Sequence, residues 1–283
     1  MSKKKAYVIG TNVSKSLSPT IFNYWLSKYR IEAEYGYKEI TEENFDREIK
    51  STLEEDGLCG LNITIPFKEK IIQHLDILDK HSAQIGAVNC VSKIDKTLNG
   101  ANTDWLGFQE SLNWAQEHRT AKIEKKDTAI VIGYGGSAKA IIYSLSFMGF
   151  KTIRVFNRSF NKIKNINNIT PHKLEELKDY FGEADLIVNT VPINFEKELR
   201  LGLPRYTIAD SLNATGHGFD AVYNYNTLFL GHISYPKRIY GIHMLIHQAA
   251  PCFHKWFGIK PEVDIPLVLL LENKNISVLE GKK

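Results

Sequence analysis

The sequence of 283 residues contains only three cysteines, Cys59, Cys90 and Cys252, and they lie far apart. An odd, dispersed set provides neither a disulfide framework nor the close ligand spacing of a structural metal site, so we expect a reducing compartment, the cytoplasm. No apolar run approaches the roughly 20 residues that cross a bilayer. The apolar part of the N-terminus is also too short for a signal peptide. We therefore expect a protein that uses neither a membrane nor a metal ion.

The sequence also lacks a strong excess of either charge. It has 36 basic and 32 acidic residues, a net charge of +4, and no basic stripe with interleaved aromatic residues. Nucleic acid is therefore not expected as a partner, whereas a phosphorylated small molecule is compatible with this charge. The hydrophobic content of 43% is ordinary for a globular chain, and the length suits one large domain or two ordinary ones.

A glycine-rich turn at residues 133–138 is the most informative stretch. It follows an apolar, β-branched run at 128–132, which predicts a buried strand, and it precedes a helical pattern at 139–148. A strand, a glycine turn and a helix in this order predict the first unit of a dinucleotide-binding βαβ fold. A plain strand–turn–helix connection with incidental glycines remains the alternative.

Each residue of this turn has a place in the expected fold. Gly133 permits the tight turn, Gly135 lets the backbone approach a pyrophosphate, and Ala138 lets the helix pack closely on the strand. Gly136 and Ser137 lie between them, where the free N–H groups and the helix dipole favour phosphates.

A second strand signal at residues 151–156 lacks the acidic residue that usually follows it in NAD-binding units. Arg158 and Lys162 stand there instead, and a cationic pair suits the 2′-phosphate of NADP. We therefore expect NADP rather than NAD. A solvated surface charge is the alternative for Arg158.

Alternating strand and helix signals predict an α/β protein with two domains, one of them a Rossmann-type dinucleotide-binding domain. We expect residues 1–104 and 243–283 to form a substrate-binding and catalytic domain, and residues 105–242 to form the NADP-binding domain. The closing helices should pack back on the first domain, and the two domains should close over their ligands by a hinge.

Individual elements are predicted as follows. Strands are expected at 7–10, 34–40, 58–65, 87–91, 96–100, 185–191, 207–212 and 219–223. Helices are expected from the N-cap Ser18, at 41–53, after Pro66, after Asp104 to about residue 118, and at 243–257 and 263–272. Residues 161–170, rich in Asn and Ile, are expected to be irregular.

Polar residues gather where strands end, which is where open α/β sheets bind ligands. They are Ser16, Ser18, Asn62, Thr64, Lys68, Asn89 and Asp104. A single such residue can equally be a cap or a turn former, and Asp104 can be the N-cap of the following helix. Lys68 can be a solvated charge, although lysine is slightly unfavourable in the first turn of a helix.

Taken together, the motifs resemble the shikimate dehydrogenase family. They are S-L-S-P at 16–19, N-I-T-I-P-F-K at 62–68, G-A-V-N at 86–89, G-A-N-T-D at 100–104, N-R-S at 157–159, D-A-V-Y at 220–223, and G-I-H-M-L at 241–245 with Gln248. The resemblance covers nearly the whole chain, and this joint order is far more specific than any single motif.

The resemblance implies an NADP-dependent oxidoreductase of aromatic amino acid biosynthesis that interconverts 3-dehydroshikimate and shikimate. It implies that Lys68 and Asp104 form the catalytic pair and that Ser16 and Ser18 bind the substrate carboxylate. The resemblance also implies that the carboxylate or the ring hydroxyls of the substrate are bound by Asn62, Thr64, Asn89, Tyr223 and Gln248. The cofactor is expected at Gly133, Gly135, Gly136, Ser137, Ala138, Asn157, Arg158, Lys162, Val191, Gly241 and Met244.

Four positions depart from the family pattern. Lys15 and Phe22 replace usual histidines, Val191 replaces a threonine, and Trp105 replaces a small residue. A paralogue that acts on quinate or an aminated analogue, including one that uses NAD, therefore stays open, as does a non-catalytic binding protein. A methyltransferase normally has an acidic residue after the second strand, which this chain lacks. We expect a small-molecule substrate and a monomer or homodimer.

Overall fold

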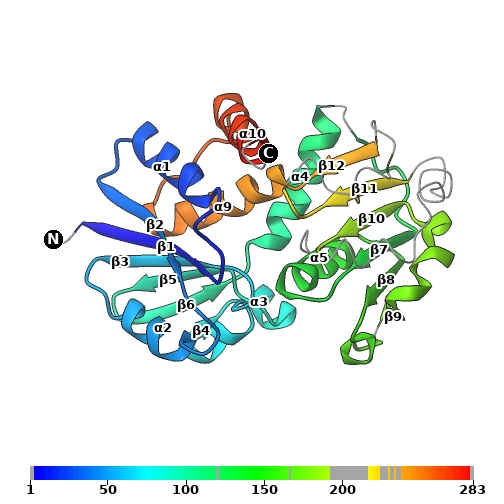
Figure 1. Ribbon diagram of the computed structural model, residues 1–283, viewed down its shortest axis with the longest axis horizontal. Helices are drawn as coiled ribbons and strands as arrows, with labels where there is room; N and C mark the ends of the chain where they lie inside the picture. The colour runs from blue at the N-terminus through cyan, green and yellow to red at the C-terminus, as the bar shows by residue number, and fades with distance from the viewer. Residues whose placement is uncertain are drawn as a thin grey trace. The chain divides into compact units, whose positions relative to one another are not determined.

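The computed structural model of the protein describes residues 3–118, 121–165, 167–191, 216–223, 229, 233 and 237–280. The chain divides into two units, Met1–Gly107 with Ile246–Lys274, and Phe108–Leu245 with Asn275–Lys283. Each unit is built on a six-stranded sheet (Figure 1). In the described part of the chain, the helices are too short or too polar to cross a membrane.

The sheet of the first unit has the strand order β2-β1-β3-β5-β6-β4. Its strands are β1 (Lys4–Gly10), β2 (Ala33–Glu39), β3 (Leu58–Ile63), β4 (Ile77–Leu78), β5 (Cys90–Ile94) and β6 (Thr97–Ala101). Strands β1, β2 and β3 are parallel, and β5 is antiparallel to both β3 and β6. The helices are α1 (Ser18–Lys28), α2 (Phe45–Leu53), α3 (Lys80–Ile85) and the 3-10 helix η1 (Lys70–His74).

The chain ends in α9 (Ile242–Phe257) and α10 (Ile265–Glu280). Two residues of α9, Phe253 and Trp256, pack against aromatic rings of the first unit. Phe253 lies edge-on to Trp25 at 5.4 Å, and Trp256 stacks on Phe22 at 5.3 Å. All four rings are buried, so α9 contributes directly to the core of the first unit.

The sheet of the second unit has the order β12-β11-β10-β7-β8-β9, and its strand pairs are parallel. Its strands are β7 (Thr128–Ile132), β8 (Thr152–Asn157), β9 (Ile169–Lys173), β10 (Leu186–Asn189), β11 (His217–Asp220) and β12 (Arg238–Tyr240). The helical elements are α4 (Asp104–Glu117), α5 (Gly136–Phe147) and the 3-10 helices η2 (Phe160–Lys162), η3 (Leu174–Asp179) and η4 (Phe181–Glu183). The chain proceeds from β7 in opposite directions across the sheet, as in a doubly wound dinucleotide-binding fold.

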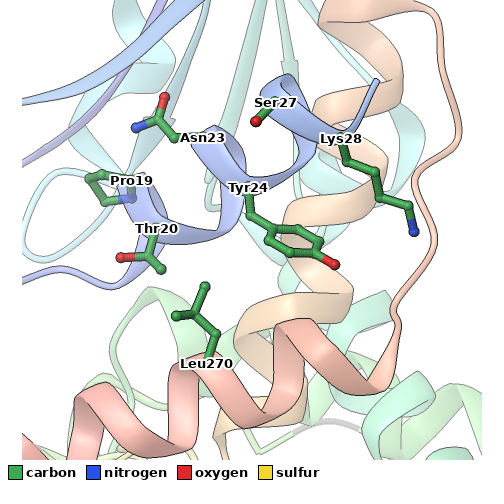
Figure 2. Close-up of a pocket in the computed structure, with 7 residues that line it drawn as sticks. All are labelled: Pro19, Thr20, Asn23, Tyr24, Ser27, Lys28 and Leu270. Atoms are coloured by element: carbon green, nitrogen blue, oxygen red, sulfur yellow. The ribbon is translucent and has the colours of Figure 1, made fainter. Parts of the chain in front are cut away.

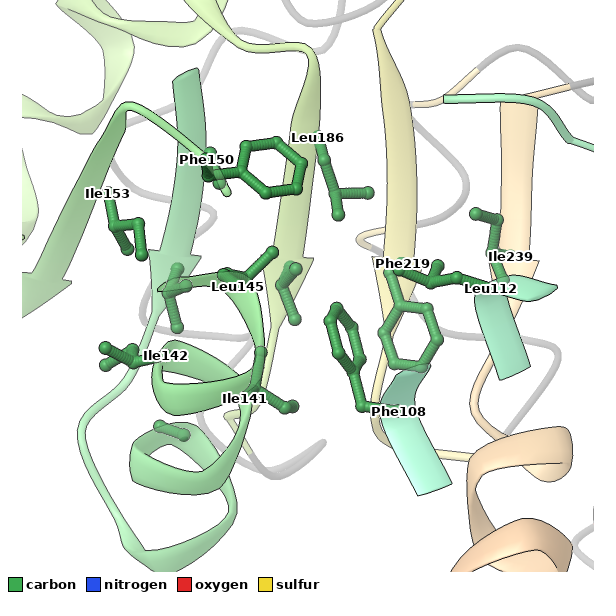
Figure 3. Close-up of a cluster of buried hydrophobic side chains, with 14 of the residues drawn as sticks. Phe108, Leu112, Ile141, Ile142, Leu145, Phe150, Ile153, Leu186, Phe219 and Ile239 are labelled. Atoms are coloured by element: carbon green, nitrogen blue, oxygen red, sulfur yellow. The ribbon is translucent and has the colours of Figure 1, made fainter. Parts of the chain in front are cut away.

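The central strand β7 is buried on both of its faces. Val131 belongs to a hydrophobic cluster with Leu145 of α5 and Phe219 of β11 (Figure 3). Its neighbour Ile130 points the other way, into a second cluster that contains Leu177. A parallel strand covered on both faces needs apolar residues at consecutive positions, which explains the uninterrupted run read in the sequence.

The start of α1 differs from the prediction. Leu17 is the N-cap, and Ser18 and Pro19 are the first helical residues, so the expected capping role of Ser18 was wrong. The Ser16 hydroxyl accepts the backbone N–H of Ser18 at 3.2 Å, which satisfies a donor that the helix itself leaves unpaired.

Other differences arise where pairing between distant segments decides the structure. The segment after Pro66 forms turns and the short helix η1 rather than an α-helix. Part of the stretch expected to be irregular enters β9, because Ile169 pairs with Ile153 of β8. The strand predicted at 219–223 begins earlier, at His217, and ends at Asp220. The strand predicted at 207–212 lies outside the described residues.

Candidate active site

Lys68 and Asp104 form a buried ion pair. The Lys68 Nζ lies 2.5 Å from the Asp104 Oδ2, and the two residues are only 7% and 4% exposed. The N–H of Asp104 donates to the Asn102 side chain at 3.0 Å, so Asn102 supplies the acceptor at the start of α4. The carboxylate of Asp104 is directed to Lys68 instead. Burial also contradicts the alternative of a solvated Lys68.

Asn89, which precedes β5, holds this pair in a hydrogen-bond network. Its Nδ2 lies 2.8 Å from Asp104 Oδ1, 2.9 Å from Thr103 Oγ1 and 3.0 Å from Gln248 Oε1, three acceptors that share its two hydrogens. Its Oδ1 accepts the N–H of Thr103 at 2.6 Å. The carboxamide of Asn89 therefore joins the residue before β5 to α4 and α9, and both oxygens of Asp104 have donors.

Asn62, the fifth residue of β3, lies next to this network. Its Nδ2 donates to the backbone oxygen of Asn89 at 3.2 Å and to Cys252 Sγ at 3.3 Å, and its Oδ1 accepts from the Tyr35 hydroxyl at 2.7 Å. Neither Tyr35 nor Cys252 is expected from the sequence, since a buried strand aromatic and an isolated cysteine carry no motif.

Ser16, Ser18 and Thr64 follow neighbouring parallel strands. Ile9 of β1 is in register with Ile63 of β3, and the N–H of Thr64 donates to the Ile9 oxygen at 2.9 Å. The loops after these two strands therefore leave the same edge of the sheet. Ser18 is buried, whereas Ser16 and Thr64 are partly exposed.

In the second unit, the glycine turn has the backbone that a nucleotide cradle needs. Gly133 has φ +103°, and a Cβ there would lie 2.4 Å from Thr190 Oγ1. Gly135 is the N-cap of α5, is exposed, and has open space where a Cβ would be. Gly136 and Ser137 begin α5, and Ala138 is buried. Backbone N–H groups at this helix start could receive phosphate oxygens.

The remaining predicted cofactor residues in this unit differ in exposure. Asn157 ends β8, and beyond it Arg158 and Lys162 are exposed, where a phosphate could reach them. Val191 is partly exposed after β10. Met244 is only 6% exposed and lies in the hydrophobic cluster of this unit, so its side chain contributes to the core.

Two other predicted residues lie in the second unit. Tyr223 is partly exposed three residues after β11. Gly241 is buried, and a Cβ there would lie 2.4 Å from the backbone oxygen of Asp220, which explains why a glycine is needed.

The residues that depart from the family pattern differ in burial and packing. Phe22 is fully buried and stacks on Tyr35 with ring centroids 4.0 Å apart, so it is a packing residue. Trp105 is 7% exposed and packs against the His81 ring at 4.8 Å. Lys15 is exposed. The change at Phe22 therefore lies in the interior of the first unit.

A surface groove of about 610 Å³ lies elsewhere in the first unit, between α1 and α10 (Figure 2). It is lined by Pro19, Thr20, Asn23, Tyr24, Ser27, Lys28 and Leu270, and none of these is a predicted catalytic, substrate or cofactor residue. Within the ranges that the structure describes, no group of three or more His, Cys, Asp or Glu could hold a metal ion.

Comparison with known proteins gives consistent matches along the chain. The family model for the shikimate dehydrogenase substrate binding domain matches residues 8–91, and that for shikimate / quinate 5-dehydrogenase matches residues 115–193. A protein of Bartonella tribocorum named shikimate dehydrogenase (NADP(+)) is 32% identical over 92% of this chain and 90% of its own length.

Solved structures of shikimate dehydrogenases are also similar to this chain. The shikimate dehydrogenase of Thermotoga maritima has a TM-score of 0.78 at 29% identity and covers 96% of this chain and 99% of its own. The shikimate 5-dehydrogenase of Thermus thermophilus in complex with NADP(H) and shikimate has a TM-score of 0.74 at 27% identity, covering 92% and 95%. The predicted fold class is confirmed. The chain belongs to the shikimate dehydrogenase family.

Proposed function

We propose that this protein is an NADP-dependent shikimate dehydrogenase that reversibly reduces 3-dehydroshikimate to shikimate. The observation that carries the proposal is the buried ion pair of Lys68 and Asp104, 2.5 Å apart, in a chain of this family. The first unit, to which the substrate-binding family model matches, is the substrate domain. The second unit is the NADP-binding domain.

The glycine turn fits NADP. Gly135 leaves open space before the first N–H groups of α5, which a Cβ would partly fill, and the turn is suited to a pyrophosphate. The exposed cations Arg158 and Lys162 follow β8, where a 2′-phosphate is bound in this fold. Relatives of this chain carry NADP(+) in their names, which supports the same cofactor here.

When bound, NADPH supplies the hydride that reduces the ring ketone. Negative charge then develops on the ketone oxygen. The ammonium of Lys68 stabilises that charge and donates a proton from Nζ to the oxygen. Asp104 holds Lys68 through Oδ2 and is itself held through Oδ1 by Asn89. In the oxidative direction, the neutral amine of Lys68 accepts the proton of the substrate hydroxyl and becomes the ammonium again.

The other predicted residues bind and orient the ring. Ser16 and Ser18 bind the substrate carboxylate. They follow β1, and Thr64 follows the adjacent parallel strand β3, so all three residues lie beyond the same edge of the sheet, which supports this role. The residues proposed to contact ring hydroxyls or the carboxylate are Asn62, Thr64, Asn89, Tyr223 and Gln248. A buried polar network of this kind favours a ligand that supplies several hydroxyl groups.

A four-way assay tests the function. Shikimate and quinate are each supplied with NADP or NAD, and absorbance at 340 nm reports reduced cofactor. We expect the highest kcat/KM with shikimate and NADP. A preference for quinate would identify the paralogue, and a preference for NAD would remove Arg158 from the site. The absence of turnover with all four pairs would favour a non-catalytic binding protein.

The cell compartment and assembly belong to the same proposal. The described cysteines are free thiols, and Cys90 and Cys252 are fully buried, which supports a reducing cytoplasm. We propose a monomer or a homodimer, and light scattering coupled to gel filtration distinguishes the two.

A further inference from the structure

The carboxamide of Asn62 has little hydrogen-bonding capacity left for a ligand. The backbone oxygen of Asn89 can only accept, so the atom that faces it must be Nδ2 of Asn62. The two hydrogens of Nδ2 are taken by Asn89 and by Cys252 Sγ. On Oδ1, the Tyr35 hydroxyl occupies one of two lone pairs. Asn62 can therefore offer a ligand one acceptor site and no donor.

This count defines what Asn62 can recognise. A carboxylate presents only acceptors, so it gains nothing from the remaining lone pair of Oδ1. A ring hydroxyl presents a donor and fits it. The hydrogen bond from the Tyr35 hydroxyl sets the direction of that lone pair. At 2.7 Å it is the shortest of the three hydrogen bonds that the Asn62 carboxamide makes.

Tyr35 is held rigidly enough to set this direction. It lies in β2, is 5% exposed, and its ring stacks on Phe22 with an interplanar angle of 7°. Burial raises the pKa of its phenol well above the usual range, so the hydroxyl keeps its proton. A second hydrogen bond joins its side chain to that of Ser18. Tyr35 therefore contacts both Asn62 and a residue of the predicted carboxylate site.

We propose that Tyr35 is a positioning residue that aims the Asn62 carboxamide at a ring hydroxyl of the substrate. The inference rests on the proposed function and adds to it. Tyr35 touches neither substrate nor cofactor, and it acts through Asn62. Its effect should therefore appear in substrate binding and not in the chemical step.

The test is Tyr35→Phe, which keeps the ring stack and removes only the hydroxyl. We expect the KM for shikimate to rise about tenfold, the size of one lost hydrogen bond of ordinary strength, while kcat and the KM for NADP change less than about twofold. Tyr37→Phe is the matched control, because Tyr37 lies in the same strand with its side chain half exposed. It should leave all three constants unchanged.

A double-mutant cycle separates positioning from general destabilisation. In an Asn62→Ala background, Tyr35→Phe should raise the KM for shikimate less than about twofold further, because Asn62 is the group through which Tyr35 acts. An unchanged KM in Tyr35→Phe, or the full tenfold effect without Asn62, would overturn the inference while leaving the function intact. No shikimate turnover in the unmodified protein would overturn both.

Discussion

At the scale of single residues, the candidate site contains an ammonium and a carboxylate that are buried away from water. Lys68 and Asp104 lie deep in the first unit, where an ion pair persists only when each partner is satisfied. Asn89 supplies the second donor to Asp104. The same burial that makes such a pair costly makes its ammonium effective against a developing oxyanion.

Replacing Lys68 by alanine should lower kcat with shikimate by about two to four orders of magnitude, the usual range for a lost acid–base group. The KM should change less, because Lys68 acts mainly in the chemical step. Steady-state kinetics measures both constants, and circular dichroism verifies folding. Lys70→Ala is the control, since Lys70 is exposed two residues away. A folded Lys68→Ala variant with normal turnover would refute the assigned role.

His247 gives the first unit a predictable response to acid. Burial lowers its pKa from 6.5 to about 4, and within the described residues its Nε2 has no hydrogen-bond partner. The unfolded chain therefore takes up a proton below pH 6.5 that the folded chain takes up only near pH 4. The stability associated with neutral His247 is complete above pH 6.5 and is lost as the pH falls to about 4.

Between pH 6.5 and pH 4, His247 alone should lower the unfolding free energy by about 3 kcal/mol. Urea unfolding measures the unfolding free energy at pH 7 and at pH 4. The decrease between these two values should be about 3 kcal/mol smaller in His247→Gln than in the unmodified protein. His254→Gln provides the comparison, because His254 is exposed on the same helix and should keep the full decrease. An equal decrease in all three proteins would show that His247 is not the responsible group.

At the scale of elements, the contact between β3 and α9 requires a residue without a side chain. A Cβ on Gly60 would lie 2.0 Å from Trp256 Nε1, which donates to the Val91 oxygen at 3.0 Å. The indole therefore rests directly on the backbone of β3. Asn62, a proposed substrate-binding residue, lies two residues further along this strand.

Gly60→Ala should lower the unfolding free energy by about 3 kcal/mol, because Trp256 must move and lose its hydrogen bond. Gly36→Ala is matched to it: Gly36 is also a strand glycine of this sheet, but its Cβ would meet Tyr7 at an ordinary 3.5 Å. That variant should change stability by less than about 1 kcal/mol. Chemical denaturation compares the two, and equal stabilities would contradict the packing argument.

Local sequence predicted elements well where one physical signal dominated. The apolar run of β7 and the turn at Gly133 appear in the structure because burial and a positive φ are visible in residue type. Short elements such as β4 and β12 were not predicted. Their backbone bonds are made to β6 and β11, so no local pattern specifies them.

At the scale of the whole molecule, the two units are built on sheets of different design. The sheet of the first unit has parallel and antiparallel pairs, and the polar network involves Asn62 of β3 and Asn89 next to β5. The sheet of the second unit has parallel pairs, and its strand β7 is followed by the glycine turn. Because only the folded second unit presents this turn with Arg158, NADP should stabilise the folded state by mass action.

Thermal unfolding should show this. At equal concentrations NADP should raise the Tm more than NAD does. At 100 times its Kd, NADP should stabilise the folded state by about 2.7 kcal/mol relative to the protein without cofactor. Arg158→Asp should reduce the NADP shift to that of NAD or below, because it places a carboxylate where we propose that the 2′-phosphate binds. Lys164→Asp is the control, an exposed lysine nearby that should keep the preference. Identical shifts for both cofactors would exclude Arg158.

The sequence by itself determined the fold class, the family and the identities of the main polar residues, because motif spacing and apolar runs are local and written in residue type. Only the tertiary structure decided which polar residues meet, and it added Tyr35, which the sequence did not indicate. The ion pair of Lys68 with Asp104 and the Tyr35 bond to Asn62 join residues 36 and 27 positions apart, and each is made by packing rather than by neighbouring sequence. Burial, which sets the strength of both contacts, is likewise a property of the assembled unit alone.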